Sequence, residues 1–189
     1  MERVRDRQVD KRQIRQRVLQ GLRGHKEEQR RRKSEAIWRK LQRLGVFRRA
    51  KTVLCYVSLP DEVQTRPLIM QMLEAGKRVM VPTVRGEDLV LSQLRDLGRD
   101  LAPGSFGVLE PKPAALRPVP VEELDLVLVP GLAFDRRGHR LGRGRGYFDR
   151  LLARLPDTTS TIGMCFDFQL FDRLPTDPHD QAVGVVVHA

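Results

Sequence analysis

Residues 124–129 read Leu-Asp-Leu-Val-Leu-Val, a nearly continuous apolar run that decides the fold. A strand of this kind is buried on both faces, which is typical of a parallel sheet covered by helices. Runs of the same type occur at residues 52–57, 78–84, 159–165 and 182–187. The sequence therefore predicts several strands of one mainly parallel sheet.

Helical patterns lie between these runs. Apolar residues spaced along one helix face predict a helix over residues 65–75, which Gly76 ends. A second helix is expected over residues 147–155. A turn at residues 86–88 leads into a short strand at residues 89–91. Strands that alternate with helices indicate an α/β fold, here a three-layer α/β/α arrangement.

The first 50 residues predict a helical arm. Apolar residues recur at helical spacing over residues 8–22 and again over residues 34–44. We expect Ser34 to cap the second helix and Gly45 to stop it. The chain of 189 residues is then a single domain, in which the arm (1–50) packs on the α/β body (51–189). Residues 98–120, rich in glycine and proline, are expected to be mostly irregular.

Positive charge is concentrated in this arm. The chain has 35 Lys and Arg against 24 Asp and Glu, and residues 1–51 hold 19 of the basic and 6 of the acidic residues. The rest of the chain is slightly acidic. Such asymmetry either marks a solvated helix face or a contact with a polyanion, so a nucleic-acid-binding protein remains an alternative. The body, however, carries no RRM, KH or helix-turn-helix signature.

The remaining composition points to a cytoplasmic protein. No run of about 18 apolar residues is present, so no membrane span is expected. The charged N-terminal segment lacks the apolar region of a secretory signal. Cys55 and Cys165 lie within apolar runs, which predicts two buried, reduced thiols.

The most distinctive segment is Arg-Leu-Gly-Arg-Gly-Arg-Gly-Tyr-Phe-Asp-Arg, residues 140–150. Its glycines allow a ligand to approach the backbone closely, and its arginines surround that backbone with positive charge. The segment follows the strand ending at Val129 and precedes a helix, which is where α/β proteins bind ligands. These features favour a polyphosphate site.

Two other interpretations of the segment stay open. It has neither the Lys-Ser/Thr pair of a Walker A loop nor the GxGxxG spacing of a dinucleotide-binding loop. A glycine- and arginine-rich surface turn, or a nucleic-acid contact, would have the same composition.

Five segments of the chain, in order, resemble those of the 5-formyltetrahydrofolate cyclo-ligase family, also called 5,10-methenyltetrahydrofolate synthetase. The strongest is VLVPGLAFDRRGHRLGRGRGYFDR at residues 127–150. The others cover most of the chain from about residue 34 onward, and they are YVSLPDEVQT (56–65), EAGKRVMVPTV (74–84), FGVLEP (106–111) and LPTDPHD (174–180).

The resemblance implies an ATP-dependent ligase. Members of the family use ATP and Mg²⁺ to convert 5-formyltetrahydrofolate to 5,10-methenyltetrahydrofolate, ADP and phosphate. The partners of this chain would then be ATP and 5-formyltetrahydrofolate, with no nucleic acid and no membrane, and the protein is expected to be a monomer. A relative of the family with another folate-like substrate is a further alternative.

The resemblance also implies a role for each matching residue. Catalysis falls to Arg143, Arg145 and Tyr147, and the magnesium ligands are Asp149 and Asp180. The ATP site comprises Lys11, Arg15, Arg140, Leu141, Gly142, Arg143, Gly144, Arg145, Gly146, Tyr147 and Phe148. The substrate site comprises Val57, Glu62, Phe106, Arg143 and Tyr147.

The chain departs from the family pattern at three places. Phe148 replaces the second tyrosine of the family loop, so the hydroxyl of that residue is missing. Gly184 stands where the family has a late aspartate. The usual Thr-Glu close is Val187-His188 here. The C-terminal edge of the site is therefore the part that the resemblance defines least.

Overall fold

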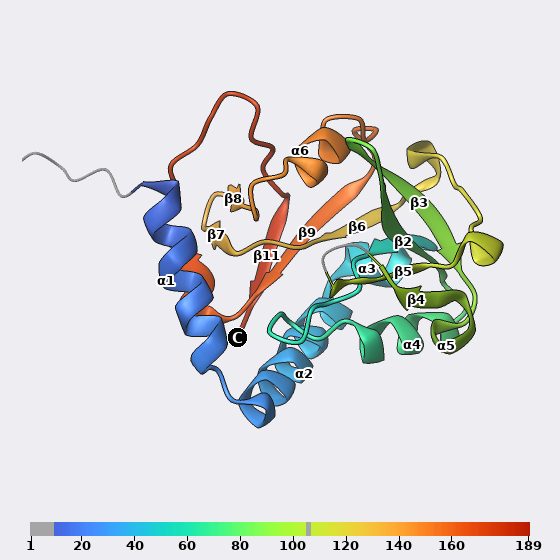
Figure 1. Cartoon of the computed structure of the whole chain (residues 1–189), viewed down its shortest axis with the longest axis horizontal. Coiled ribbons are helices and arrows are strands. Elements are labelled where there is room, and N and C mark those ends of the chain that lie inside the picture. Colours follow the sequence, from blue (N-terminus) through green and yellow to red (C-terminus); the bar gives the residue numbers. More distant parts are fainter. Residues whose placement is uncertain (1–9, 105–106) are drawn as a thin grey trace, which may run out of the picture.

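A computed structural model describes residues 10–104 and 107–189. Its centre is a six-stranded sheet with the strand order β11-β9-β6-β1-β2-β3 (Figure 1). These strands are β1 (Thr52–Cys55), β2 (Arg78–Arg85), β3 (Asp88–Leu94), β6 (Leu126–Val129), β9 (Ser160–Cys165) and β11 (Val185–His188). The helices are α1 (Lys11–Gly24), α2 (Glu27–Arg43), α3 (Gly45–Arg49), α4 (Arg66–Glu74), α5 (Leu97–Asp100) and α6 (Tyr147–Leu152).

The sheet is parallel except at one edge, as the apolar runs predict. Each neighbouring pair from β11 to β2 is parallel, whereas β2 and β3 form an antiparallel hairpin. The strand β6, from which the prediction started, lies in the middle and is buried along its whole length. The predicted α/β fold is therefore confirmed.

Successive residues of the central strands face opposite layers. Val53 and Cys55 of β1 join the larger core cluster, together with apolar residues of α1, α2 and α4. Leu54 joins the second cluster, together with Leu151 and Leu152 of α6. The helices α1, α2 and α4 thus pack on one face of the sheet, and α6 lies over the other face (Figure 1).

The N-terminal helices pack closely on the body. Ile14, Val18 and Leu22 of α1 are almost fully buried, as are Ile37 and Leu41 of α2. Their burial in the larger core cluster explains why a highly charged segment forms stable helices, since each helix has one apolar face.

The predicted start of the second helix of the arm is wrong. Ser34 does not cap α2, because the helix already begins at Glu27 and Ser34 is buried within it. Its hydroxyl accepts a hydrogen bond from the Gln64 backbone N–H at 3.0 Å, so it connects the helix to the body. The predicted end of this helix holds to within one residue, because α2 ends at Arg43 and does not continue through Gly45. Leu44 is extended, and Gly45 begins the short helix α3.

Several short elements were not predicted. Residues 98–120 include an antiparallel pair of strands, β4 (Leu101–Pro103) and β5 (Leu109–Pro111). A second small sheet consists of β7 (Ala133–Asp135), β8 (Arg140–Leu141) and β10 (Leu170–Phe171). Three 3₁₀ helices cover Pro113–Ala115, Val121–Glu123 and Asp167–Gln169. Most of these elements have two or three residues, too few to show a hydrophobic period.

Gly163 in β9 lies where the six-stranded sheet packs closely against Phe134 of the small sheet that contains β7. A Cβ atom at this position would lie 2.3 Å from Cε1 of Phe134, which is itself fully buried. We therefore expect Gly163→Ala to lower the free energy of unfolding by about 1–3 kcal/mol, because the ring must shift within a packed core. Denaturant unfolding measures this change.

Gly24 provides the matched control. It lies at the end of α1, and a Cβ atom there meets no atom within 4 Å. Gly24→Ala should leave stability unchanged or raise it by a few tenths of a kcal/mol. If the two variants unfolded at the same denaturant concentration, the close contact at Gly163 would not be a determinant of stability.

Candidate functional site

A cavity of about 670 Å³ opens where β1, β2 and β6 end. Tyr56 and Val57 follow β1, Pro130 to Leu132 follow β6, and Pro82 and Val84 belong to the last part of β2. Side chains from α1, the glycine- and arginine-rich loop and residues 177–180 complete its walls. The position agrees with the rule that α/β sheets bind ligands at the carboxyl ends of their strands.

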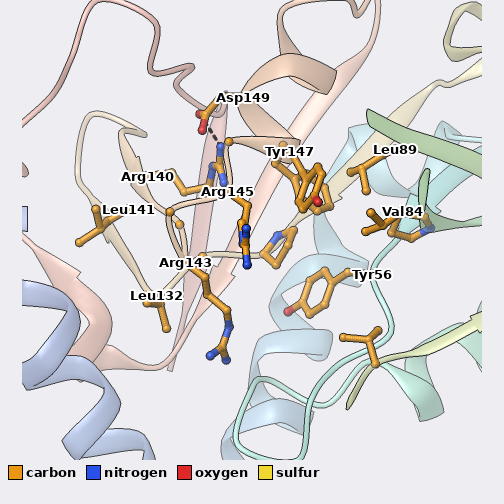
Figure 2. Close-up of a pocket in the computed structure, with 18 of the residues that line it drawn as sticks. Tyr56, Val84, Leu89, Leu132, Arg140, Leu141, Arg143, Arg145, Tyr147 and Asp149 are labelled. Carbon is orange, nitrogen blue, oxygen red and sulfur yellow. Dashed lines mark hydrogen bonds and ion pairs between the residues drawn. The ribbon is translucent and has the colours of Figure 1, made fainter. Parts of the chain in front are cut away.

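The loop at residues 142–146 forms one wall of this cavity. The loop lies after the strand ending at Val129 and before α6, as predicted, but the β7–β8 hairpin, which was not predicted, lies between that strand and the loop. Gly144 and Gly146 have φ angles of 103° and 70°, which favour glycine, and Gly146 is the residue before α6. Figure 2 shows Arg143 and Arg145 extending from the loop into the cavity.

Arg140 and Asp149 form an ion pair beneath the loop. An Nη2 hydrogen of Arg140 is donated to Oδ1 of Asp149 at 2.6 Å (Figure 2), and the Arg140 side chain is 4% exposed. Burial lowers the pKa of the Arg140 guanidinium, while attraction to Asp149 opposes that change. The guanidinium still remains charged, because an arginine pKa starts far above neutral pH. The pair therefore fixes the direction of the Asp149 carboxylate.

Asp135 holds the hairpin that carries Arg140. Its fully buried carboxylate accepts hydrogen bonds from the backbone N–H groups of Arg137, His139 and Leu174, and it contacts His139 Nδ1 at 3.0 Å. Burial acts to raise the pKa of Asp135, but these hydrogen bonds prevail and the pKa is lowered. Hydrogen bonds to an ionised acceptor are among the stronger ones in proteins.

This lowered pKa predicts a pH effect on stability. Because the folded-state pKa lies below the unfolded one, the stabilisation is complete above the unfolded value of about 3.9 and is lost as the pH falls through the folded value. Asp135→Asn should therefore lower the free energy of unfolding at neutral pH by about 1–3 kcal/mol. It should also make stability less dependent on pH in the acidic range. Equal pH dependence of unfolding in the two proteins would contradict this role.

Lys11 connects α1 to the C-terminal side of the cavity. Its Nζ lies 2.6 Å from Oδ2 of Asp177 and 2.5 Å from Oδ2 of Asp180. Burial acts to lower the pKa of Lys11, but the two aspartates prevail and raise it. One turn further along α1, Arg15 donates a hydrogen bond from Nε to the Gly142 carbonyl at 3.0 Å. The first helix of the arm therefore contacts the loop and forms part of the site.

Glu62 and Arg143 are in direct contact at the wall of the cavity. Nη2 of Arg143 donates to Oε1 of Glu62 at 3.0 Å, and Asp61 lies 3.7 Å from the same nitrogen. The other carboxylate oxygen of Glu62 accepts a hydrogen bond from the Leu59 N–H at 3.1 Å. The residue expected to bind the pterin and one expected to bind phosphate are thus neighbours.

Apart from Phe106, all residues that the sequence singles out for the site line this one cavity. Phe106 lies outside the described residues. The structure adds lining residues that the sequence did not indicate, among them Tyr56, Pro82, Val84, Leu89, Leu132 and Asp177. Most of these are apolar residues of β2, β3 and the segment after β6, and several are labelled in Figure 2. No local motif unites them, and only the sheet order brings them together.

Oxygen ligands suited to Mg²⁺ are present on this side of the cavity. Ligand atoms of Asp177, His179 and Asp180 lie within 4.8 Å of one another, and Asp149 is outside this group. The negative charges of Asp149 and Asp180 both act to raise the pKa of Arg140, which burial lowers. Mg²⁺ prefers one or two carboxylates together with phosphate oxygens and water, and these residues fit that preference.

Fold and site together define an α/β protein with a ligand cavity at the carboxyl ends of its strands. Its walls combine a basic, glycine-rich loop, paired carboxylates and an apolar floor. Within residues 10–104 and 107–189, the helices are all too short or too polar to span a membrane.

Comparison with known proteins then identifies the family. Residues 7–189 match the model of the 5-formyltetrahydrofolate cyclo-ligase family. The 5-formyltetrahydrofolate cyclo-ligase of Mycolicibacterium smegmatis is 36% identical over 181 residues, which cover 94% of this chain and 92% of the relative. That of Mus musculus is 29% identical, with coverage of 94% and 93%.

A solved structure agrees with these relatives. The NMR structure of Aquifex aeolicus 5,10-methenyltetrahydrofolate synthetase matches with a TM-score of 0.83 and 37% identity, covering 94% of this chain and 89% of that one. The chain belongs to the 5-formyltetrahydrofolate cyclo-ligase family and is an enzyme of that class.

Proposed function

We propose that this cyclo-ligase couples the conversion of 5-formyltetrahydrofolate to 5,10-methenyltetrahydrofolate to the conversion of ATP to ADP and phosphate, with Mg²⁺. The observation that carries the proposal is that one cavity contains both a loop suited to phosphates and a carboxylate suited to a pterin. The loop supplies arginines and glycine backbone, and Glu62 is in direct contact with Arg143. Two ligands that must react with each other need such a shared cavity.

The chemistry requires activation of the formyl group. This group is an amide of nitrogen-5, and resonance makes its carbon a poor electrophile. In the first step the formyl oxygen attacks the γ-phosphorus, the bond from that phosphorus to the bridging oxygen breaks, and ADP leaves. In the second step nitrogen-10 attacks the formyl carbon and loses its proton, the carbon–oxygen bond breaks, and phosphate leaves. The protein must align the two ligands and neutralise phosphoryl charge.

The residues divide between the two ligands. Arg140, Arg143, Arg145 and the loop backbone bind the phosphates, and Lys11 and Arg15 approach them from α1. Glu62 accepts hydrogen bonds from the amino-pyrimidinone edge of the pterin, since a carboxylate has only acceptors to offer. Val57 and Phe106 contact the folate, and Tyr147 lies beside the group that is transferred. Asp149 and Asp180 would hold Mg²⁺, which neutralises charge on the phosphates.

The setting of the enzyme is proposed on the same grounds. Cys55 and Cys165 are buried and unpaired, which supports a reducing compartment, and we propose the cytoplasm. We propose ATP and 5-formyltetrahydrofolate as partners and a monomeric enzyme. We also propose that the basic arm serves this reaction and not nucleic acid, which is supported by the packing of the apolar face of α1 in the core and by Lys11 and Arg15 in the cavity lining.

An absorbance assay tests the proposal. Purified protein, 5-formyltetrahydrofolate and ATP with Mg²⁺ should produce the chromophore of the methenyl product. Omitting ATP or chelating Mg²⁺ should stop the reaction, and restoring either should restart it. Folded protein that forms no product, or forms it equally well without ATP, would refute the proposed function.

A further inference from the structure

Tyr56 is a lining residue to which neither the family resemblance nor the proposed roles give a task. It directly follows β1, and 5% of its surface is exposed. The chain has two tyrosines, and both line the cavity. Tyr147 enters from α6, whereas Tyr56 lies on the floor, with its hydroxyl directed into the cavity (Figure 2).

The hydroxyl of Tyr56 has no hydrogen-bond partner among residues 10–104 and 107–189. The hydroxyl is not one of the buried polar atoms that lack a partner, so it is open to the cavity, and phenylalanine would fill the same space in the core without a polar group there. The hydroxyl therefore has no visible purpose in the folded chain itself. A ligand in the cavity can supply a partner.

The position of Tyr56 is fixed before any ligand binds. The Thr65 hydroxyl donates to the Tyr56 carbonyl at 2.7 Å and accepts from the Ser58 N–H at 2.9 Å. The Ser58 hydroxyl in turn accepts from the Thr65 N–H at 3.1 Å. These bonds close the loop that carries both Tyr56 and Glu62, so the two side chains have a fixed relation. Such preorganisation lowers the entropy cost of binding.

The chemistry of the two groups is complementary. Burial raises the pKa of the Tyr56 hydroxyl, and the negative charge of Glu62 raises it further, so the group keeps its proton and can donate it in a hydrogen bond. Glu62 offers only acceptors. A pterin ring presents two donors, N3–H and the 2-amino group, next to one acceptor, the carbonyl oxygen at position 4. A carboxylate can satisfy the donors but not that oxygen.

We propose that the Tyr56 hydroxyl binds the folate by donating a hydrogen bond to the 4-carbonyl oxygen of the pterin, while Glu62 accepts from the neighbouring donors. The proposal rests on the binding of the pterin at Glu62 given under the proposed function. Tyr56 is then a specificity-determining residue for the 2-amino-4-oxo edge. It belongs to the binding of folate and not to the transfer of phosphate.

Tyr56→Phe tests this assignment, because it removes the hydroxyl and keeps the ring. Titration with 5-formyltetrahydrofolate should show a dissociation constant raised about five- to tenfold, the effect of losing one buried hydrogen bond. The KM for ATP and kcat should stay within about twofold, because the lost interaction is the same in the ground and transition states. Tyr147→Phe, the matched hydroxyl deletion, should instead change kcat more than folate affinity.

Stability separates a binding role from a structural one. Because the hydroxyl has no partner in the described part of the chain, unliganded Tyr56→Phe should melt at the wild-type temperature or higher. A lower melting temperature, an equal loss of ATP affinity, or a folate dissociation constant within twofold of wild type would each overturn the proposal. Wild-type protein that binds 5-formyltetrahydrofolate but forms no methenyl product would refute the proposed function and leave the Tyr56 comparison valid.

Discussion

Arg145→Ala is expected to lower kcat/KM for ATP by about 100- to 1,000-fold, the usual effect of removing one charge-stabilising group from a transition state. Arg145 extends from the loop into the cavity, and the adjoining Arg150 supports the loop by donating to the Arg145 carbonyl at 3.2 Å. Substitution removes the charge and leaves this backbone contact in place. Initial rates at varied ATP concentrations measure the effect.

Arg154→Ala is the control for general loss of positive charge. Arg154 follows α6, is about half exposed, and makes only a distant ion pair with Asp88 at 3.9 Å. It does not line the cavity, so its loss should leave the rate within about twofold of wild type, as for most exposed ion pairs. The affinity of the Arg145→Ala variant for folate should also change little. Equal losses for both ligands would contradict the assignment of Arg145 to phosphate.

Glu62→Gln is expected to raise the dissociation constant for 5-formyltetrahydrofolate by about 10- to 100-fold. A hydrogen bond to a charged acceptor contributes about 1.5–3 kcal/mol, and the substitution replaces one charged acceptor oxygen with a donor. The KM for ATP should rise far less. Equilibrium titration with 5-formyltetrahydrofolate, followed by rates at varied ATP concentrations, measures both effects.

Asp61→Asn is the matched control for Glu62. Asp61 is adjacent, carries the same charge and lies 3.7 Å from Arg143, but it does not line the cavity. Its substitution should alter folate affinity by no more than about threefold, since exposed ion pairs contribute little. A similar loss of folate affinity in both variants would show that local negative charge matters, and not the Glu62 carboxylate itself.

The sheet could be predicted because its strands have a physical signature. Central strands of a parallel sheet are buried on both faces, so β6 and β1 stand out as apolar runs. The short strands β7, β8 and β10 have no such signature. The start of α2 was predicted wrongly at Ser34, because the sequence does not distinguish a hydroxyl that caps a helix from one that accepts a hydrogen bond from the Gln64 backbone.

The site could be predicted where its residues are contiguous or belong to a family motif. Residues 140–149 and Glu62 are of this kind. Val84, Leu89 and Leu132 are ordinary apolar residues in sequence, and only the order of the strands places them around one cavity. The pairing of Lys11 with Asp177 joins residues 166 positions apart, which no local pattern could indicate. Long-range ion pairs depend on the fold as a whole.

The central claim is that this cavity brings the γ-phosphorus of ATP to the formyl oxygen of the folate. Oxygen-18 placed in the formyl group of 5-formyltetrahydrofolate tests it most directly. If the formyl oxygen attacks phosphorus, the label must leave with phosphate, and mass spectrometry should find one labelled oxygen in each phosphate released. Methenyl product formed together with unlabelled phosphate would contradict the claim.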